Sequence, residues 1–224
     1  MLTPSPAAGG EDGGAVPASF CPSIIPDGEE FVNCFFSLFS FAIMKKHSYM
    51  LRTLNRDLWG EDKMEIKKAT DIEMLSLWGH KNMDSVPPTT LFFAQNISSG
   101  NAEFWTLNDN GQIIGELYIF WKLSDKDFAD GKNRAYLCAF RIKSEYRGKG
   151  HGSFLLKEIL EYIKNKGIQT VTIGVDETEE HNIRMYHRFG FTNKIKDCFE
   201  DPCNVDREMK PKASPCFWLL AKSL

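Results

Sequence analysis

The chain has 224 residues, of which 42% are hydrophobic and 25% are charged. This is enough apolar material for one sizeable core, with an appendage if the core is small. The formal net charge of −3 provides no basic surface of the kind that nonspecific binding to a phosphate backbone requires, so nucleic acid is not an expected partner. One catalytic domain is the simplest expectation.

The cysteine pattern predicts free thiols. The six cysteines show no C-x-x-C pair followed by a second pair or by two histidines, as zinc sites do. A three-ligand metal site from the last three would be an irregular cluster, so no metal is expected. Free thiols are typical of a reducing cytosol, and we expect a cytoplasmic protein. The cysteines are Cys21, Cys34, Cys138, Cys198, Cys203 and Cys216.

The first 63 residues differ in composition from the rest. Residues 1–30 are rich in Gly, Pro, Ala and acidic residues and are predicted to be disordered. Residues 31–44 form an apolar run that is too short to span a bilayer comfortably. Acidic residues precede this run, unlike the basic start of a secretory signal, so no integral membrane span is expected. The run could be buried, meet a membrane surface or a partner, or support a homodimer. We expect a non-catalytic extension over 1–63 and a catalytic domain over 64–224.

From Met64 onward the patterns become regular. A short strand is expected around Ile66, and Thr70 to Glu73 has the pattern of a capping box that begins a helix. A second, short helix is expected after Pro87-Pro88, capped by Thr89 or Thr90. Residues 102–107 and 112–121 read as two strands joined by a turn over 108–111, and they predict an antiparallel hairpin.

The second half continues this alternation of strands and helices. A strand is expected over 134–142 and a helix over 153–166, whose apolar residues recur on one stripe. A strand over 170–175, a short helix over 182–188, a tight turn over 189–191 and a final strand over 215–221 follow. The predicted fold class is α/β, with a mixed, mostly antiparallel central sheet flanked by helices.

A glycine-rich loop lies between the strand over 134–142 and the helix that follows it. Its sequence, Arg147-Gly148-Lys149-Gly150-His151-Gly152, leaves several backbone amides free to face an anion, close to the positive end of a helix dipole. The spacing lacks the closing Gly-Lys-Ser/Thr of a P-loop and does not meet the dinucleotide fingerprint. The loop therefore predicts a phosphate cradle, although a mobile turn would have the same composition.

Two motifs resemble the GNAT superfamily of N-acetyltransferases, and in particular its bacterial small-amine members. Arg147, Gly150 and Gly152 fill the places of the family's acetyl-CoA loop, which reads Arg or Gln, two residues, Gly, one residue, Gly or Ala. Asn182, Tyr186 and the Gly190-Phe191 pair match its second signature. The resemblance covers roughly 64–224 and is strongest over 140–191. It implies the GNAT acyl-CoA N-acyltransferase fold, with acetyl-CoA as co-substrate.

The resemblance also implies roles for individual residues. Amides of the glycine loop would hold the pyrophosphate of CoA, the 140–142 strand would pair with the pantetheine arm, and Asn182 would contact that arm. Tyr186 would lie near the sulfur, where a phenol can protonate the departing thiolate. The alternative for Tyr186 is a helix aromatic packed in the core. The implied cofactor-binding residues are Phe140, Arg141, Ile142, Arg147, Gly148, Lys149, Gly150, His151, Gly152, Ser153 and Asn182.

No motif of the family marks the general base in this sequence. The strand over 136–142 carries no carboxylate, although some members of the family have one there. Glu116 is our candidate, and Asp176 and Glu177 are the alternatives.

The acceptor is expected to be a small-molecule or peptide amine. Acidic residues gather in three expected loops and favour a cationic acceptor. They are Asp125, Asp127 and Asp130, then residues 176–180, then Glu200 and Asp201. The expected reaction is direct transfer of the acetyl group in a ternary complex. A catalytically silent CoA-binding or sensing module of the same fold, and a nucleotide-phosphate binder unrelated to CoA, are the competing interpretations.

Overall fold

The computed structural model describes residues 64–224 except residue 84. The predicted extension over 1–63, with its apolar run, lies outside the described residues. The described elements are β1 (Met64–Ala69), α2 (Asp71–Leu77), α3 (Pro88–Ser98), β2 (Ala102–Asp109), β3 (Gln112–Phe120), β4 (Arg134–Ile142), a 3-10 turn (Ser144–Tyr146), α4 (His151–Asn165), β5 (Thr170–Asp176), α5 (Glu180–Arg188), β6 (Asn193–Val205) and β7 (Pro211–Ser223).

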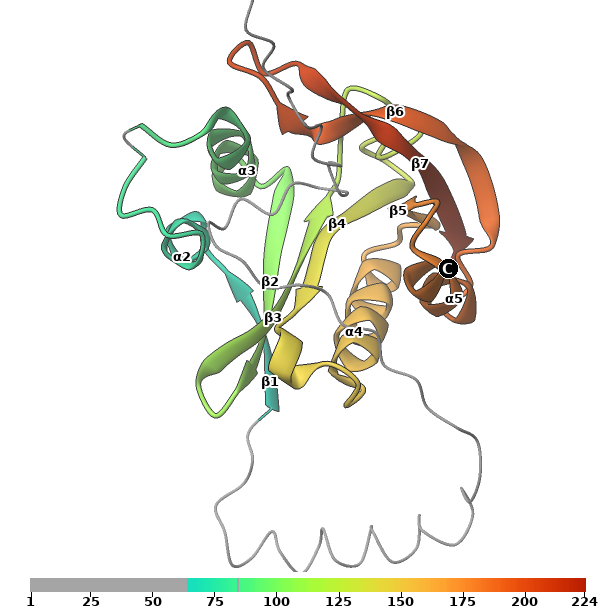
Figure 1. Cartoon of the computed structure of the whole chain (residues 1–224), viewed down its shortest axis with the longest axis horizontal. Helices are drawn as coiled ribbons and strands as arrows, with labels where there is room; N and C mark the ends of the chain where they lie inside the picture. The colour runs from blue at the N-terminus through green and yellow to red at the C-terminus, as the bar shows by residue number, and fades with distance from the viewer. Residues whose placement is uncertain (1–63, 84) are drawn as a thin grey trace, which may run out of the picture.

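A seven-stranded sheet in the order β1-β2-β3-β4-β5-β7-β6 forms the centre of the fold (Figure 1). Neighbouring strands in this sheet are antiparallel except β4 and β5. These two run parallel because α4 connects them as a crossover. The prediction of a mixed, mostly antiparallel sheet flanked by helices is confirmed. Within the described part of the chain, no helix combines the length and apolar character needed to cross a membrane.

Two hydrophobic clusters cover the two faces of the sheet. One face packs on α2 and α3 through Met74, Phe93 and Tyr118. The other packs on α4 and α5 through Leu156, Ile159 and related residues. Figure 1 shows α2 and α3 on one side of the sheet and α4 and α5 on the other. We call these the α2/α3 face and the α4/α5 face.

Local signals explain where several elements begin. The Thr70 hydroxyl accepts a hydrogen bond from the Glu73 amide, and the Glu73 carboxylate accepts one from the Thr70 amide, so the predicted capping box is present. The α3 prediction needs a correction, since the helix begins at Pro88 and its N-cap is Pro87. Thr89 instead donates to Asn204 and ties α3 to β6.

The largest difference from the sequence prediction is the β6–β7 hairpin. β6 was not predicted, and β7 begins four residues before the strand expected over 215–221. The pairing of β6 with β7 shifts register three times and includes Pro202 within β6, so the sequence shows no steady alternation. Glu200 and Asp201 therefore lie in a strand instead of the expected acidic loop, and Asp201 is buried.

Candidate active site

The sheet opens between its two parallel strands. The ladder of β4 and β5 ends at the pair Leu137 and Ile173, although β4 continues to Ile142 and β5 to Asp176. The amides and carbonyls of β4 beyond Leu137 that face β5 therefore have no ladder partner in β5. Free backbone groups at a strand opening can bind an extended ligand or stabilise an oxyanion.

A bulge in β4 lies at the start of this opening. Tyr118 pairs with Cys138, but Glu116 pairs with Arg141, so two residues of β4 face the single residue Leu117 of β3. Ala139 takes a left-handed φ of 46° at this point. Cys138 and Ala139 both pack on the α2/α3 face as a result. Because of this extra residue, each later side chain of β4 lies on the opposite face from the one that regular alternation would give it.

The glycine loop lies directly after β4 and begins α4. Gly148 and Gly150 have φ values of 72° and 88°, in the left-handed region that favours glycine. Gly150 is the N-cap of α4, and no side chain from residues 64–224, apart from the undescribed residue 84, caps the helix. Among the described residues, the amides of Gly148 to Ser153 have no hydrogen-bond partner. The loop therefore presents unpaired donors at the positive end of a 15-residue helix, as an anion site does.

Contacts to neighbouring strands hold the loop against the sheet. The Nε of Arg147 donates to the carbonyl oxygen of Ile142 over 2.8 Å. Tyr146 donates to Gln112 over 3.3 Å, and the ammonium of Lys149 lies over the Tyr146 ring. The ring of His151 also lies near the Tyr146 ring, with centroids 6.3 Å apart. The cation of Arg147 thus anchors the loop to the end of β4.

Gly152 lies where α4 meets β4. A β-carbon added there would touch Phe140 at 3.4 Å and Ile142 at 3.5 Å. Both side chains belong to the α4/α5 face. The start of α4 therefore lies tightly against the part of β4 beyond the bulge.

Helix α5 carries the residues of the second motif. Tyr186 is 7% exposed and packs on the α4/α5 face near Phe191. Burial, followed by the charge of Glu179, raises the pKa of Tyr186 well above its ordinary value. The side-chain amide of Asn182 donates to Glu179. The phenol is therefore held in its protonated form, as a proton donor must be.

Glu116 lies on the α2/α3 face in a closed set of contacts. Its Oε1 is 2.6 Å from the Nε of Arg141, directly across the β3–β4 pair. Its Oε2 accepts from the Tyr118 hydroxyl at 3.1 Å and from the Trp78 indole at 3.4 Å. The carboxylate side chain is only 8% exposed. This environment suits a fixed partner of Arg141 better than a base that exchanges protons with solvent.

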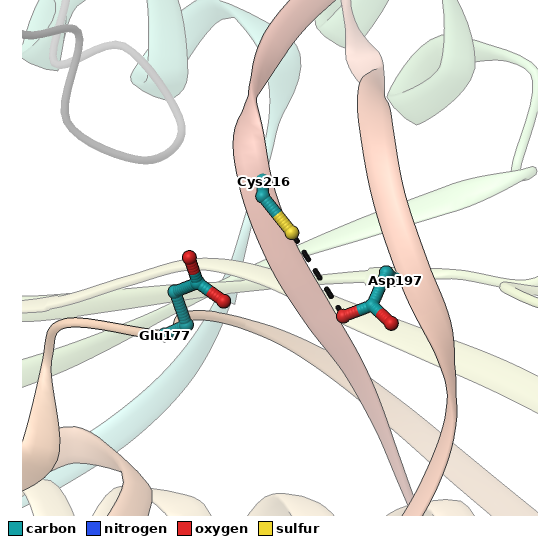
Figure 2. A group of neighbouring side chains, drawn as sticks. All are labelled: Glu177, Asp197 and Cys216. Carbon is teal, nitrogen blue, oxygen red and sulfur yellow. Dashed lines mark hydrogen bonds between the residues drawn. The ribbon is translucent and has the colours of Figure 1, made fainter.

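The two alternative base candidates lie on different faces. Thr172 packs towards Phe128 of the α2/α3 cluster, and alternation along β5 places Asp176 on the same face. One Asp176 oxygen accepts from the amide and hydroxyl of Thr178. Glu177 points instead towards Asp197 and Cys216, as Figure 2 shows. Cys216 alternates with Phe217 and so lies on the α4/α5 face.

The group in Figure 2 is the one set of potential metal ligands found among the described residues, with ligand atoms within 4.8 Å of one another. Glu177 and Asp197 are exposed, and Asp197 is paired with Lys194 at 2.6 Å. The cluster imagined from Cys198, Cys203 and Cys216 does not form, since the first two are buried in the α2/α3 cluster and Cys216 contacts Asp197. The four described cysteines are free thiols, as predicted.

The acidic loops are largely neutralised. Lys196 contacts both Asp125 and Asp127, at 2.5 Å and 2.9 Å. One oxygen of Asp130 accepts from three successive backbone amides. Glu180 pairs with Arg184. The structural role of these carboxylates accounts for much of the acidic character of the sequence, which weakens its value as a sign of a cationic acceptor.

Sequence reasoning missed two residues at the opening. Arg141 was expected to act through its backbone, but its side chain lies beside Trp78 on the α2/α3 face. Glu179, which touches Asn182 and raises the pKa of Tyr186, was grouped with the acidic surface. No signal in the sequence marks the bulge that orients Arg141. The spacing of Glu179 three residues before Asn182, at the start of α5, could have indicated the second contact.

Curated relatives match parts of the chain. The rat protein named N-acetyltransferase 8 is 25% identical over 105 residues, which are 47% of this chain and 46% of that protein. The spermine/spermidine N(1)-acetyltransferase of Bacillus subtilis is 31% identical over 83 residues, which are 36% of this chain and 53% of that protein. The matched part thus spans about half the length of these relatives.

Solved structures share the fold. The ribosomal-protein-S18-alanine N-acetyltransferase of Escherichia coli aligns with a TM-score of 0.53 and 15% identity, over 72% of this chain and 94% of that chain. Arabidopsis thaliana NAA60, solved with a bisubstrate analogue, aligns with a TM-score of 0.51 and 17% identity, over 72% and 99%. The model of the acetyltransferase (GNAT) family matches residues 64–191, which include the opening, the glycine loop and α5. The chain therefore belongs to the GNAT acetyltransferase family.

Proposed function

We propose that the protein transfers the acetyl group of acetyl-CoA to a primary amine, by direct attack within a ternary complex. The observation that carries this proposal is that an opening in the sheet and a loop of unpaired amides adjoin each other along β4. The β4–β5 ladder ends at Leu137 and Ile173, and the unpaired amides of Gly148 to Ser153 follow at the end of β4. An extended arm with a phosphorylated end would fit both features at once.

The donor would bind along β4. The amides of Gly148 to Ser153 would hold the pyrophosphate, with Lys149 and His151 nearby and Arg147 as the anchor of the loop. The pantetheine arm would pair with the free backbone groups of Phe140 to Ile142, as a peptide adds to a strand edge. Asn182, at present bonded to Glu179, would contact the same arm from α5.

The reaction needs an oxyanion donor and a proton for the leaving group. The amine nitrogen bonds to the thioester carbon, and a free amide of β4 beyond the bulge would stabilise the oxyanion. The carbon–sulfur bond then breaks, and the Tyr186 hydroxyl would give its proton to the thiolate. The proton that the amine loses balances this one, so the products are an acetamide and neutral CoA thiol.

We assign proton removal to Asp176, acting through water, in preference to Glu116 or Glu177. Asp176 lies at the end of β5, on the face opposite α4, and its second carboxylate oxygen has no partner among the described residues. Glu116 is enclosed by Arg141 and two other donors. Glu177 is directed to Asp197 and Cys216, and Cys216 lies on the α4/α5 face.

The acceptor would be an amine that enters from the α2/α3 face. The CoA pyrophosphate would approach from the N-terminus of α4, so the donor would cross the opening from the α4/α5 face. The relatives carry names that refer to spermine, spermidine and a protein alanine. A cationic amine is therefore one candidate class, and a peptide amine is another.

One experiment separates the proposal from its rivals. The full chain is incubated with acetyl-CoA and a panel of amines, and binding and thiol release are measured together. Release that depends on an amine, with an equal amount of acetylated product, supports the enzyme. Binding of acetyl-CoA without release on any amine would indicate a silent CoA-binding module. Absence of binding would contradict both and favour a nucleotide-phosphate site.

A further inference from the structure

The bulge in β4 decides where Arg141 points. If β4 were regular after Cys138, residue 140 would lie on the same face as Cys138, and residue 141 would lie on the opposite face. Because the bulge adds a residue at Ala139, Phe140 and Ile142 pack on the α4/α5 face. Arg141 is thereby turned to the α2/α3 face, just past the point where β4 and β5 separate.

The contacts of Arg141 use one end of its guanidinium group. Its Nε lies 2.6 Å from Oε1 of Glu116, in a close ion pair whose N–H is not aligned on the oxygen. Its Cζ lies 5.7 Å from the centre of the Trp78 ring. The two terminal nitrogens have no partner among the described residues, and the side chain is 29% exposed. A cation is thus fixed in place with its fork of donors available.

The contacts of Glu116 hold the Arg141 cation in one position. Glu116 is nearly buried and is itself held by Tyr118 and Trp78, so the pair cannot reorient freely. A buried pair of this kind is weak evidence for stability, because desolvation offsets much of its attraction. A guanidinium group whose terminal nitrogens remain available is well suited to bind a carboxylate through two parallel hydrogen bonds.

We propose that Arg141 binds a carboxylate of the acceptor, and that the acceptor class is an amine bearing a carboxylate close to its nitrogen, as in an α-amino acid. This inference rests on the proposed acetyl transfer. The CoA phosphates belong to the glycine loop at the opposite face, so Arg141 is placed for the second substrate. A polyamine would instead bring a second cation towards the guanidinium, which like-charge repulsion disfavours.

The test compares matched acceptors that differ in the carboxylate. The full chain is assayed with L-phenylalanine against phenethylamine and with L-lysine against cadaverine, with rates referred to the concentration of uncharged amine. We expect kcat/KM to be about 10- to 100-fold higher for each amino acid, which corresponds to one charged hydrogen-bonded contact. Most of the difference should appear in KM.

Variants then assign the preference to Arg141. The double variant Arg141→Gln with Glu116→Gln removes both charges, so neither is left buried alone, and it should bring the ratio close to 1. Arg141→Lys should keep part of the preference, since it retains the charge without the fork. Arg134→Gln removes another cation of β4, one that pairs with Asp127, and should leave the ratio unchanged.

Each outcome decides between the two proposals. Acetylation of phenethylamine or cadaverine at rates equal to or above those of the amino acids would overturn this inference and leave acetyl transfer intact. A preference that survives in the double variant would also overturn it. Binding of acetyl-CoA without thiol release on any of the four amines would overturn this inference, and the same result across the whole panel of amines would contradict the proposed function as well.

Discussion

The backbone amide of Phe191 donates to the carbonyl oxygen of Tyr186 over 3.0 Å, and the two rings lie 6.1 Å apart. Gly190 makes this closure of α5 possible with a left-handed φ of 90°. Phe191 is fully buried on the α4/α5 face. The Gly-Phe pair of the second motif therefore has a structural role, because it fixes the end of the helix that carries the proposed acid.

Replacing Tyr186 by Phe should separate chemistry from binding. The ring would stay packed, and only the proton donor would be lost. We expect kcat to fall about 100-fold or more, as for loss of a general acid, with the Kd of acetyl-CoA changed less than about twofold. Steady-state kinetics and calorimetry measure the two quantities. An unchanged kcat would remove Tyr186 from the mechanism.

The same phenol should also make stability depend on alkaline pH. Its pKa is raised in the folded state by burial and by Glu179, whereas an unfolded tyrosine titrates near 10. The protonated form is therefore favoured by folding, and this contribution is complete below pH ~10 and is lost as pH rises further. The stability difference between the protein and Tyr186→Phe should shift by about 1.4 kcal/mol per pH unit above ~10 in urea unfolding. A pH-independent difference would show that folding does not raise the pKa of Tyr186.

Gly150 and Gly167 form a matched pair for testing the anion site. Both have left-handed φ values, 88° and 82°, and an added β-carbon would meet nothing within 4 Å at either position. Substitution by Ala should cost about 1–2 kcal/mol of stability in each case. Only Gly150→Ala should also raise the Kd of acetyl-CoA, since Gly167 follows the far end of α4. Equal effects on the Kd would show that the loop acts through stability alone.

Gly115 should control the position of β4 beyond the bulge. A β-carbon there would overlap Cδ1 of Ile142 and lie 3.1 Å from the carbonyl oxygen of Arg141. Gly115→Ala should therefore displace this end of β4, lower stability by about 1–3 kcal/mol and raise the KM of acetyl-CoA. Adding Ile142→Val removes the overlapping methyl group and should restore part of the loss. Failure of this second change to help would point to a different cause.

Asp176→Asn should slow the chemical step. If Asp176 removes the amine proton through water, the variant should lose about 100-fold in kcat at neutral pH, as for loss of a general base, while the Kd of acetyl-CoA changes little. Glu177→Gln is the control, because its side chain is directed to Asp197 and Cys216. Equal kcat for the protein and Asp176→Asn would exclude this carboxylate as the base.

The sequence predicted the elements whose signals are local. The capping box at Thr70, the apolar stripe of α4 and the turn glycines each depend on neighbours a few residues apart. The glycine loop and the second motif were placed correctly on α4 and α5 for the same reason. Strand β6 was missed because its pairing with β7 is irregular and depends on distant residues.

The site was harder to predict where it depends on long-range pairing. The face on which Arg141 lies is set by a bulge relative to β3, and Glu116 is enclosed by Trp78, which is 38 residues away in the chain. Regular alternation from Cys138 onward would have placed Arg141 on the α4/α5 face, which is not where it lies. The pairing of the acidic residues could not be predicted for a similar reason, since Asp125 and Asp127 contact Lys196 about seventy residues later in the chain.

We propose that acetyl-CoA crosses the sheet at the opening of β4 and β5, and amide hydrogen exchange on the full chain, with and without acetyl-CoA, tests this placement. We expect slower exchange at Gly148 to Ser153 and at Phe140 to Ile142 together, with little change at β1 and β2. Protection of the glycine loop without β4, or protection confined to another part of the chain, would show that acetyl-CoA does not bind along β4.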